Sequence, residues 1–205
     1  MTNSQAGEST ADGAPAHTSI YVAQCHRPGG LKPVDAQALP PYHRSLLVMD
    51  GTLTHFVEAF HGEALDSAGL RQRTEPLVAY DEWLAAPPGM PVMAREAVLT
   101  GAISGRLYAY AETRIVTDRL PPCLREAIDG SGELLGRIMR ACRVETYREL
   151  LWYGFQYPDD LPEALCAHAG TRFLTRAYQI IARGRPLMVI TEKFPLPDTD
   201  EHAAS

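Results

Sequence analysis

The sequence predicts an α+β domain built on an antiparallel sheet. Several apolar runs of strand length are joined by short glycine-containing turns, as in hairpins, and helical patterns separate some of them. The regular strand–helix alternation of parallel sheets is absent from the sequence. So are G-x-G-x-x-G and G-x-x-x-x-G-K-[ST], the glycine patterns that cradle nucleotide phosphates.

The 205 residues suffice for one domain with a sizeable core. Residues 1–18 are rich in Ser, Thr, Ala, Gly and Asp, with almost no large apolar side chains, so we expect them to be disordered. The tail, residues 198–205, has a similar composition. A single domain over residues 19–197 follows.

Two short helices are predicted at the start of the domain. Pro40-Pro41 opens the first, which runs through Leu47 and ends at Asp50-Gly51. Thr52 can cap the second, whose apolar residues recur at helical spacing.

The later elements follow from changes in hydrophobic period. Residues 144–156 fit either period and are interpreted as a strand. The predicted strands are 76–84, 92–103, 106–116, 144–156, 172–183 and 186–195, with hairpin connections at 101–105 and 184–185. The predicted helices are 121–128, 133–142 and 161–168, with a turn at 129–132 between the first two.

Charge limits the partners. The formal net charge of −6 argues against a nucleic-acid or acidic-membrane surface, which needs a basic face. An anionic substrate would then need locally concentrated arginines. The sequence shows no secretory signal and no run of about 18 apolar residues, so we expect a cytoplasmic protein.

Metal and covalent chemistry are not indicated. The cysteines form no C-x-x-C pair and are expected to be free thiols; they are Cys25, Cys123, Cys142 and Cys166. The seven histidines show no H-x-H or H-E-x-x-H spacing. No G-x-S-x-G elbow is present, which disfavours acyl transfer through a serine. We therefore predict no metal.

Two charged residues interrupt apolar strand-like runs. Alternation places Arg95 on one face with Met93, Ala97 and Leu99, and Glu192 on one face with Met188 and Ile190. Burying a charge costs several kcal/mol unless partners replace water. The pair could therefore form the two ends of a small-anion pocket.

Purely structural roles remain open for these charged residues. Arg95 could form an internal salt bridge with Glu112 or Glu192. Glu192 could be a rim carboxylate at a strand end. Glu112, mid-strand on a face with Tyr108 and Tyr110, could pair with an arginine.

An ordered set of short motifs between about residues 42 and 196 resembles the chorismate lyase (4-hydroxybenzoate synthase) family, particularly its divergent chorismate pyruvate-lyase branch. The motifs are Asp50-Gly-Thr-Leu-Thr54, the strand with Arg95-Glu96, Ala111-Glu-Thr-Arg-Ile-Val-Thr-Asp-Arg-Leu-Pro121, Leu135-Gly136-Arg137, Val144-Glu-Thr146 and Ile190-Thr-Glu-Lys-Phe194. The better-known branch often carries Arg at the position of Glu112, and Pro where this chain has Leu134.

The resemblance implies a single antiparallel sheet with helices packed on one face and the ligand enclosed beneath helical flaps. It implies two catalytic residues, Arg95 on the ring carboxylate and Glu192 near the ring hydroxyl. Backbone amides at Leu53 and at Leu135-Gly136 would also touch the carboxylate. Glu112 and Arg137 complete the expected substrate-binding set.

The implied substrate, chorismate, is a dianion with an enolpyruvyl ether on a cyclohexadiene ring. Loss of a ring proton and cleavage of the C–O bond would release pyruvate and leave 4-hydroxybenzoate. Glu192 would act as proton donor or relay at the ether oxygen, and the reaction would require no cofactor. The candidates for holding the second carboxylate are Arg137, Arg114 and Arg176.

Two alternatives remain open. The pocket could serve another lyase, isomerase or cyclase reaction. The chain could instead be a non-catalytic small-ligand sensor, because the same fold forms the UTRA-type effector domain of some transcription regulators. We expect a monomer or small homo-oligomer, with a small anionic ring compound as partner and neither nucleic acid nor membrane.

Overall fold

A computed structural model describes residues 20–130, 132–157, 165 and 171–196 of the chain. The termini expected to be disordered lie outside the described residues. So does the helix predicted at 161–168, apart from Leu165.

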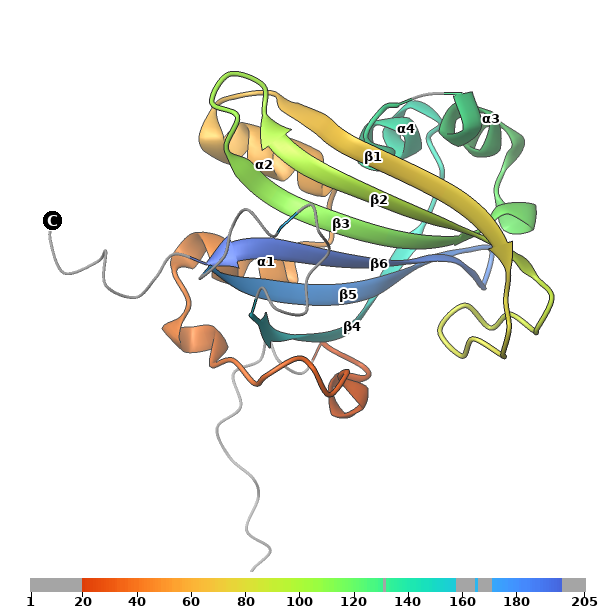
Figure 1. The fold of residues 1–205 in the computed structure, drawn as a ribbon, viewed down its shortest axis with the longest axis horizontal. Coiled ribbons are helices and arrows are strands. Elements are labelled where there is room, and N and C mark those ends of the chain that lie inside the picture. Colours follow the sequence, from red (N-terminus) through yellow and green to blue (C-terminus); the bar gives the residue numbers. More distant parts are fainter. Residues whose placement is uncertain (1–19, 131, 158–164, 166–170, 197–205) are drawn as a thin grey trace, which may run out of the picture.

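Six antiparallel strands form one sheet in the order β1-β2-β3-β6-β5-β4 (Figure 1). Their bounds are Leu65–Pro76 (β1), Pro91–Gly101 (β2), Leu107–Val116 (β3), Tyr147–Gln156 (β4), Arg172–Ala182 (β5) and Arg185–Leu196 (β6). The sheet is built from two hairpin groups, β1-β2-β3 and β4-β5-β6, which meet where β3 pairs with β6. This confirms the predicted antiparallel α+β architecture.

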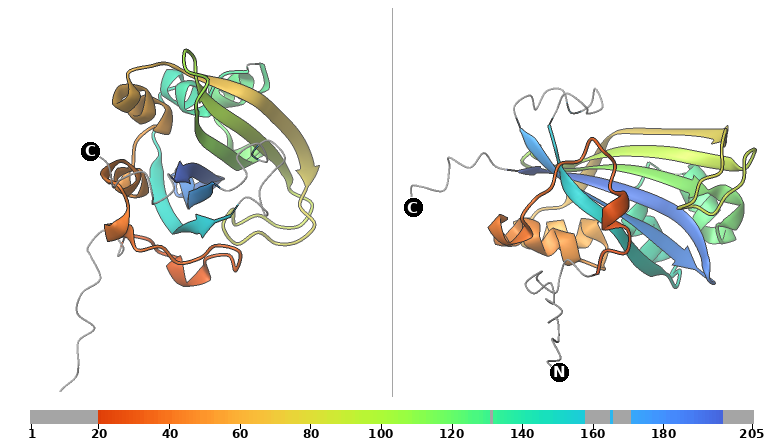
Figure 2. Two further views of the ribbon diagram at one scale, coloured as in Figure 1. Left: turned by 60° about the vertical axis from the view of Figure 1, so that its left-hand side comes forward. Right: turned by 90° about the horizontal axis from the view of Figure 1, so that it is seen from below.

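The α-helices lie along one side of this sheet (Figure 2). They are α1 (Pro41–Val48), α2 (Leu53–His61), α3 (Pro122–Gly130) and α4 (Leu135–Ala141). Within the described residues, 3₁₀ turns lie at η2 (Gln24–His26), η3 (Ala36–Ala38) and η4 (Thr117–Arg119). The main hydrophobic core fills the space between this helical layer and the sheet.

A different covering lies on the other face of the sheet. A second apolar cluster joins Leu31 from the N-terminal segment and Leu84 from the 77–90 loop to Val116, Trp152 and Val189 of the strands. Loops therefore bury this face where helices bury the first.

Most predicted elements are confirmed, and one pair of assignments is wrong. Residues 76–84 form no strand beyond Pro76: they enter a loop in which Leu84 is buried while Val78 is 96% exposed. The missed strand is β1, an edge strand. Its residues are mainly polar, and residues 71–76 are all exposed. Because Leu65 is its one buried residue, β1 shows no apolar alternation to detect.

The expectation of free cysteines is also wrong in part. Cys123 of α3 and Cys142, just after α4, form a disulfide with their Cα atoms 5.9 Å apart. The two helices lie next to each other and bring together cysteines 19 residues apart, which spacing alone does not show. Cys25 is free and exposed, and Cys166 lies outside the described residues.

None of the described helices is long and apolar enough to cross a membrane.

Candidate active site

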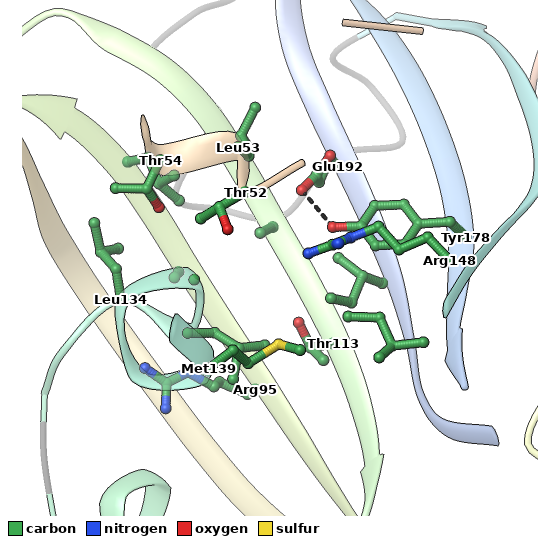
Figure 3. Close-up of a pocket in the computed structure, with 17 residues that line it drawn as sticks. Thr52, Leu53, Thr54, Arg95, Thr113, Leu134, Met139, Arg148, Tyr178 and Glu192 are labelled. Carbon is green, nitrogen blue, oxygen red and sulfur yellow. Dashed lines mark hydrogen bonds between the residues drawn. The ribbon is translucent and has the colours of Figure 1, made fainter. Parts of the chain in front are cut away.

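A cavity lies between the helix-covered face of the sheet and the first turns of α2 and α4 (Figure 3). Its floor is largely apolar, formed by Ala97, Leu99, Ala111, Ile180 and Ile190. Its roof includes Leu53, Leu134, Leu135, Gly136 and Met139. Polar groups stand at its ends, as in ligand pockets where a few polar side chains fix the orientation of a mainly apolar molecule.

Strand register places Arg95 and Glu192 on the same face of the sheet. Arg95 of β2 pairs with Thr113 of β3, which pairs with Ile190 of β6. Glu192 lies two residues further along β6. Two strand spacings and two residues correspond to about 12 Å between the two Cα atoms. Both side chains line the cavity, Arg95 at one end and Glu192 at the other (Figure 3).

Arg95 is a buried cation without a carboxylate partner. It is 3% exposed, and its guanidinium donates to Gln72 Oε1 at 3.1 Å and to the carbonyl oxygen of Glu133. Burial lowers the pKa of Arg95, and the nearby Glu133 charge opposes this. Among the described residues no carboxylate lies within salt-bridge distance of it. The plain alternative, an ion pair with Glu112 or Glu192, is therefore wrong.

Glu192 lies in the interior of the sheet and already has a cation. Nε and Nη2 of Arg176 on β5 both lie 2.8 Å from Glu192 Oε2, and the Tyr178 hydroxyl donates to Oε1 at 2.8 Å. Arg176 is itself 1% exposed and also donates to the carbonyl oxygens of Leu46 and Met49 around the end of α1. Burial, and then the charge of Glu192, raise the pKa of Tyr178.

Two helix N-termini supply backbone donors at the roof. Thr52 precedes α2 and Leu134 precedes α4, and neither side chain caps its helix. The first N–H groups of a helix have no partner inside it, so a ligand oxygen can accept from them. A Cβ on Gly136 would stand 2.4 Å from Thr52 Cγ2, so a glycine is needed where the two helices meet.

The structure thus brings together Arg95, Glu192, Leu53, Leu135 and Gly136, all of which line the one cavity. It does not bring in the other two predicted residues. Glu112 lies on the opposite face, where it pairs with Lys193 at 2.5 Å and not with an arginine. Arg137 contacts Glu58 at 2.5 Å and Glu133 at 3.1 Å and is not among the lining residues.

Sequence reasoning missed Arg148 of β4. Of the three arginines expected near a second carboxylate, Arg114 pairs with Asp81 on the far face, and neither Arg137 nor Arg176 lines the cavity. Arg148 does line it. The alternation of Arg148 with Leu150 could have placed Arg148 on the cavity face. That conclusion requires residues 144–156 to be known as a strand.

No group of three or more His, Cys, Asp or Glu side chains within the described part of the chain is arranged to hold a metal ion. The cavity's polar groups are cations, hydroxyls and one paired carboxylate.

These features define a small-molecule pocket with a positively charged lining on an antiparallel sheet. The chain belongs to the family described as chorismate pyruvate-lyase Rv2949c-like, whose family model matches residues 47–200. This confirms the family that the ordered motifs indicated.

Two relatives show the extent of the similarity. A chorismate pyruvate-lyase of Mycobacterium tuberculosis (strain H37Rv) is 31% identical over 160 residues, covering 74% of this chain and 78% of that protein. A chorismate pyruvate-lyase of Mycobacterium leprae is 31% identical over 157 residues, covering 74% and 72%.

Among solved structures, the effector domain of PhnF from Mycobacterium smegmatis aligns with a TM-score of 0.48 at 19% identity. The alignment covers 80% of this chain and 91% of that domain.

Proposed function

We propose that this protein is a chorismate pyruvate-lyase that converts chorismate to 4-hydroxybenzoate and pyruvate. The observation that carries the proposal is Arg95, a buried guanidinium that lines a cavity with an apolar floor and has no carboxylate partner in the described part of the chain. A buried cation of this kind is completed by a bound anion. A planar ring acid fits both the charge and the apolar floor.

The ring carboxylate lies at Arg95 and the first amides of α2 and α4. Guanidinium and carboxylate can form two parallel hydrogen bonds, and the helix ends add positive potential. The ring then lies over the alanines and isoleucine of the floor, with its oxygen substituents directed toward Glu192 and Tyr178. Fixing the ring in this way supplies orientation, which is a large part of what an elimination needs.

In the reaction, the ring C–H bond next to the ether-bearing carbon breaks, and its electron pair completes the aromatic ring. The bond between the ring carbon and the ether oxygen breaks in the same process, and its electron pair leaves with enolpyruvate. Enolpyruvate becomes pyruvate on taking up a proton at its methylene carbon. This elimination balances without an oxidant, reductant or metal.

Glu192 and Tyr178 manage the protons in this proposal. Both oxygens of Glu192 accept hydrogen bonds, from Arg176 and Tyr178, so the carboxylate acts as an acceptor and relay for the ring proton. The Tyr178 hydroxyl, which lines the cavity and donates to Glu192, extends the relay.

The test is to incubate the purified full chain with chorismate and to quantify 4-hydroxybenzoate and pyruvate. Equal amounts of the two products support the proposal. No turnover by the wild-type chain contradicts it, and binding without consumption would favour the sensor. A different aromatic or cyclic product would favour another reaction in the same cavity. Unchanged turnover in Glu192→Ala would remove the relay role.

Cytoplasmic location and a monomeric or small homo-oligomeric state stay predictions from the sequence. The Cys123–Cys142 disulfide counts against the cytoplasmic location, because disulfides are uncommon in cytosolic proteins.

A further inference from the structure

Arg148 stands at the Glu192 end of the cavity. In Figure 3 its side chain runs beside Tyr178 and its guanidinium reaches toward Glu192, while Arg95 lies at the other end of the group. Strand pairing agrees with this view, because Arg148 is opposite Ile180 of β5, another lining residue two positions from Tyr178.

The guanidinium of Arg148 has unused donors. Nη1 donates to the carbonyl oxygen of Asp50 at 2.9 Å, but Nε is shielded from solvent and has no hydrogen-bond partner among the described residues. No carboxylate in the described part of the chain lies within salt-bridge distance of Arg148. An arginine offers five N–H donors in a planar fork, so Arg148 has donors left for a ligand in the cavity.

The charges that line the cavity do not cancel. Of the residues that the structure describes, the charged ones lining the cavity are Arg95, Arg148 and Glu192, and Arg176 already pairs with Glu192. Two positive charges therefore remain, one at each end of an apolar floor. A monoanion would leave one of them uncompensated in a partly desolvated site, which is unfavourable.

We infer that Arg148 binds a second carboxylate of the substrate and that the cavity selects ring compounds with two negative charges over those with one. The inference rests on the proposed function for the identity of the ring, and it deepens that function by naming Arg148 as a substrate-specificity residue. In the proposed reaction, the enolpyruvyl carboxylate lies against Arg148. The same guanidinium stabilises the negative charge that develops as enolpyruvate leaves.

A matched pair of unreactive ligands tests the inference without turnover. The dianion 3-(carboxymethoxy)benzoate and the monoanion 3-methoxybenzoate share the ring carboxylate and the ether oxygen and differ in one carboxylate. Their dissociation constants are measured by calorimetry on the full chain. The wild-type chain should bind the dianion more tightly.

Arg148→Gln should weaken dianion binding roughly 10- to 100-fold, which is the range expected for hydrogen bonds to a charged group, and should change monoanion binding by less than about twofold. Arg95→Gln should weaken both ligands. Arg73→Gln, at a surface arginine of β1 whose side chain is 68% exposed, is the control and should change neither.

An unchanged preference for the dianion in Arg148→Gln would overturn the inference, as would a wild-type chain that does not prefer the dianion or binds neither ligand. Monoanion binding verifies that the variant cavity is intact. If Arg148→Gln does not fold, Arg148→Lys takes its place. The ammonium cannot form the two-pronged contact, so a partial loss is expected and full retention would contradict the assignment.

Chorismate turnover separates this inference from the proposed function. A wild-type chain that makes no 4-hydroxybenzoate, but whose dianion preference depends on Arg148, would contradict the function and leave the inference standing. If the wild-type chain converts chorismate and Arg148→Gln does so with the same KM, the function would stand and the inference about Arg148 would be contradicted.

Discussion

Three arginines on the helix-covered face of the sheet, of which Arg95 and Arg176 are buried and Arg148 is half-buried, differ in their partners, and this difference sets the charge of the cavity lining. Arg176 is paired with Glu192 and contributes no net charge to the cavity. Arg95 and Arg148 have no carboxylate within reach among the described residues, and both line the cavity. At the scale of single residues, the structure therefore separates Arg176, which is paired with a carboxylate, from two cavity-lining arginines that are not, and we propose that these two bind the carboxylates of the substrate.

Replacing Glu192 by Gln should remove the proton relay and retain the shape of the site. We expect kcat for chorismate to fall by about 10²- to 10⁴-fold, the usual contribution of a general acid or base, with little change in the affinity for 4-hydroxybenzoate. Steady-state kinetics and ligand titration measure the two effects. A variant that keeps wild-type kcat would show that the proton goes elsewhere.

Replacing Arg176 by Met should destabilise the fold, because it leaves Glu192 buried without its cation. Breaking one side of a buried ion pair typically costs about 3–5 kcal/mol, whereas removing both charges together is often nearly neutral. The double variant Arg176→Met with Glu192→Leu should therefore recover much of the stability. Urea denaturation gives both values. If the single and double variants were equally unstable, lost packing and not charge would be the cause.

At the scale of elements, two sets of contacts fix the position of the helices relative to the sheet. One is the contact of the α2 and α4 N-termini at Gly136 and Thr52, which forms the roof of the cavity. The other is Glu63, just after α2, which accepts hydrogen bonds from the hairpin between β2 and β3.

Gly136→Ala should push α4 away from α2, because the added Cβ would lie 2.4 Å from Thr52 Cγ2. Both helix ends would move from the carboxylate position. We expect the affinity for 4-hydroxybenzoate to fall by about tenfold or more, since small displacements at positioning groups have large effects. Gly132→Ala is the matched control, because its Cβ would meet nothing within 4 Å. Equal affinities in the two variants would contradict the arrangement of the roof.

Glu63 should make stability depend on pH. Hydrogen bonds from Tyr108 and from Ser104 lower the pKa of Glu63 from 4.5 to about 2. A depressed folded-state pKa means that the stabilisation is complete above about pH 4.5 and is lost as the pH falls through about 2.

The measurement compares the denaturation midpoints of the wild-type chain and Glu63→Gln between neutral and acidic pH. The difference should be constant near neutrality and shrink with acid. Glu75→Gln, at an exposed carboxylate of β1, should show no such trend. A difference independent of pH would mean that the hairpin does not depend on the charge of Glu63.

How well the sequence predicts a strand and the direction of its side chains depends on how much of the strand is buried. Period-two alternation identified the faces of Arg95 and Glu192, because both lie in strands packed on the core. The same rule could not detect β1, an exposed edge strand, nor orient Arg148 while residues 144–156 fitted two periods. The Cys123–Cys142 disulfide depends on the adjacent packing of two helices, which is a tertiary property.

At the scale of the whole molecule, one curved sheet divides two environments. The helical side holds the cavity with Arg95 and Arg148, which form no ion pair with any described residue. The loop-covered side holds ion pairs such as Lys193 with Glu112 and Arg114 with Asp81. Family membership agrees with the order of motifs along the chain, and the fold brings parts of these motifs to the cavity from α2, β2, β3, α4 and β6. Glu112 and Arg137 show the limit of motif transfer, because neighbours in sequence to site residues fall outside the site.

The most direct test of the central claim is a crystal structure of the full chain with 4-hydroxybenzoate. We predict the ligand in the cavity above Ala97 and Ala111, with its carboxylate on Arg95 and the first amides of α2 and α4, and its hydroxyl toward Glu192. A ligand bound elsewhere, or bound with its carboxylate at the Glu192 end, would contradict the account.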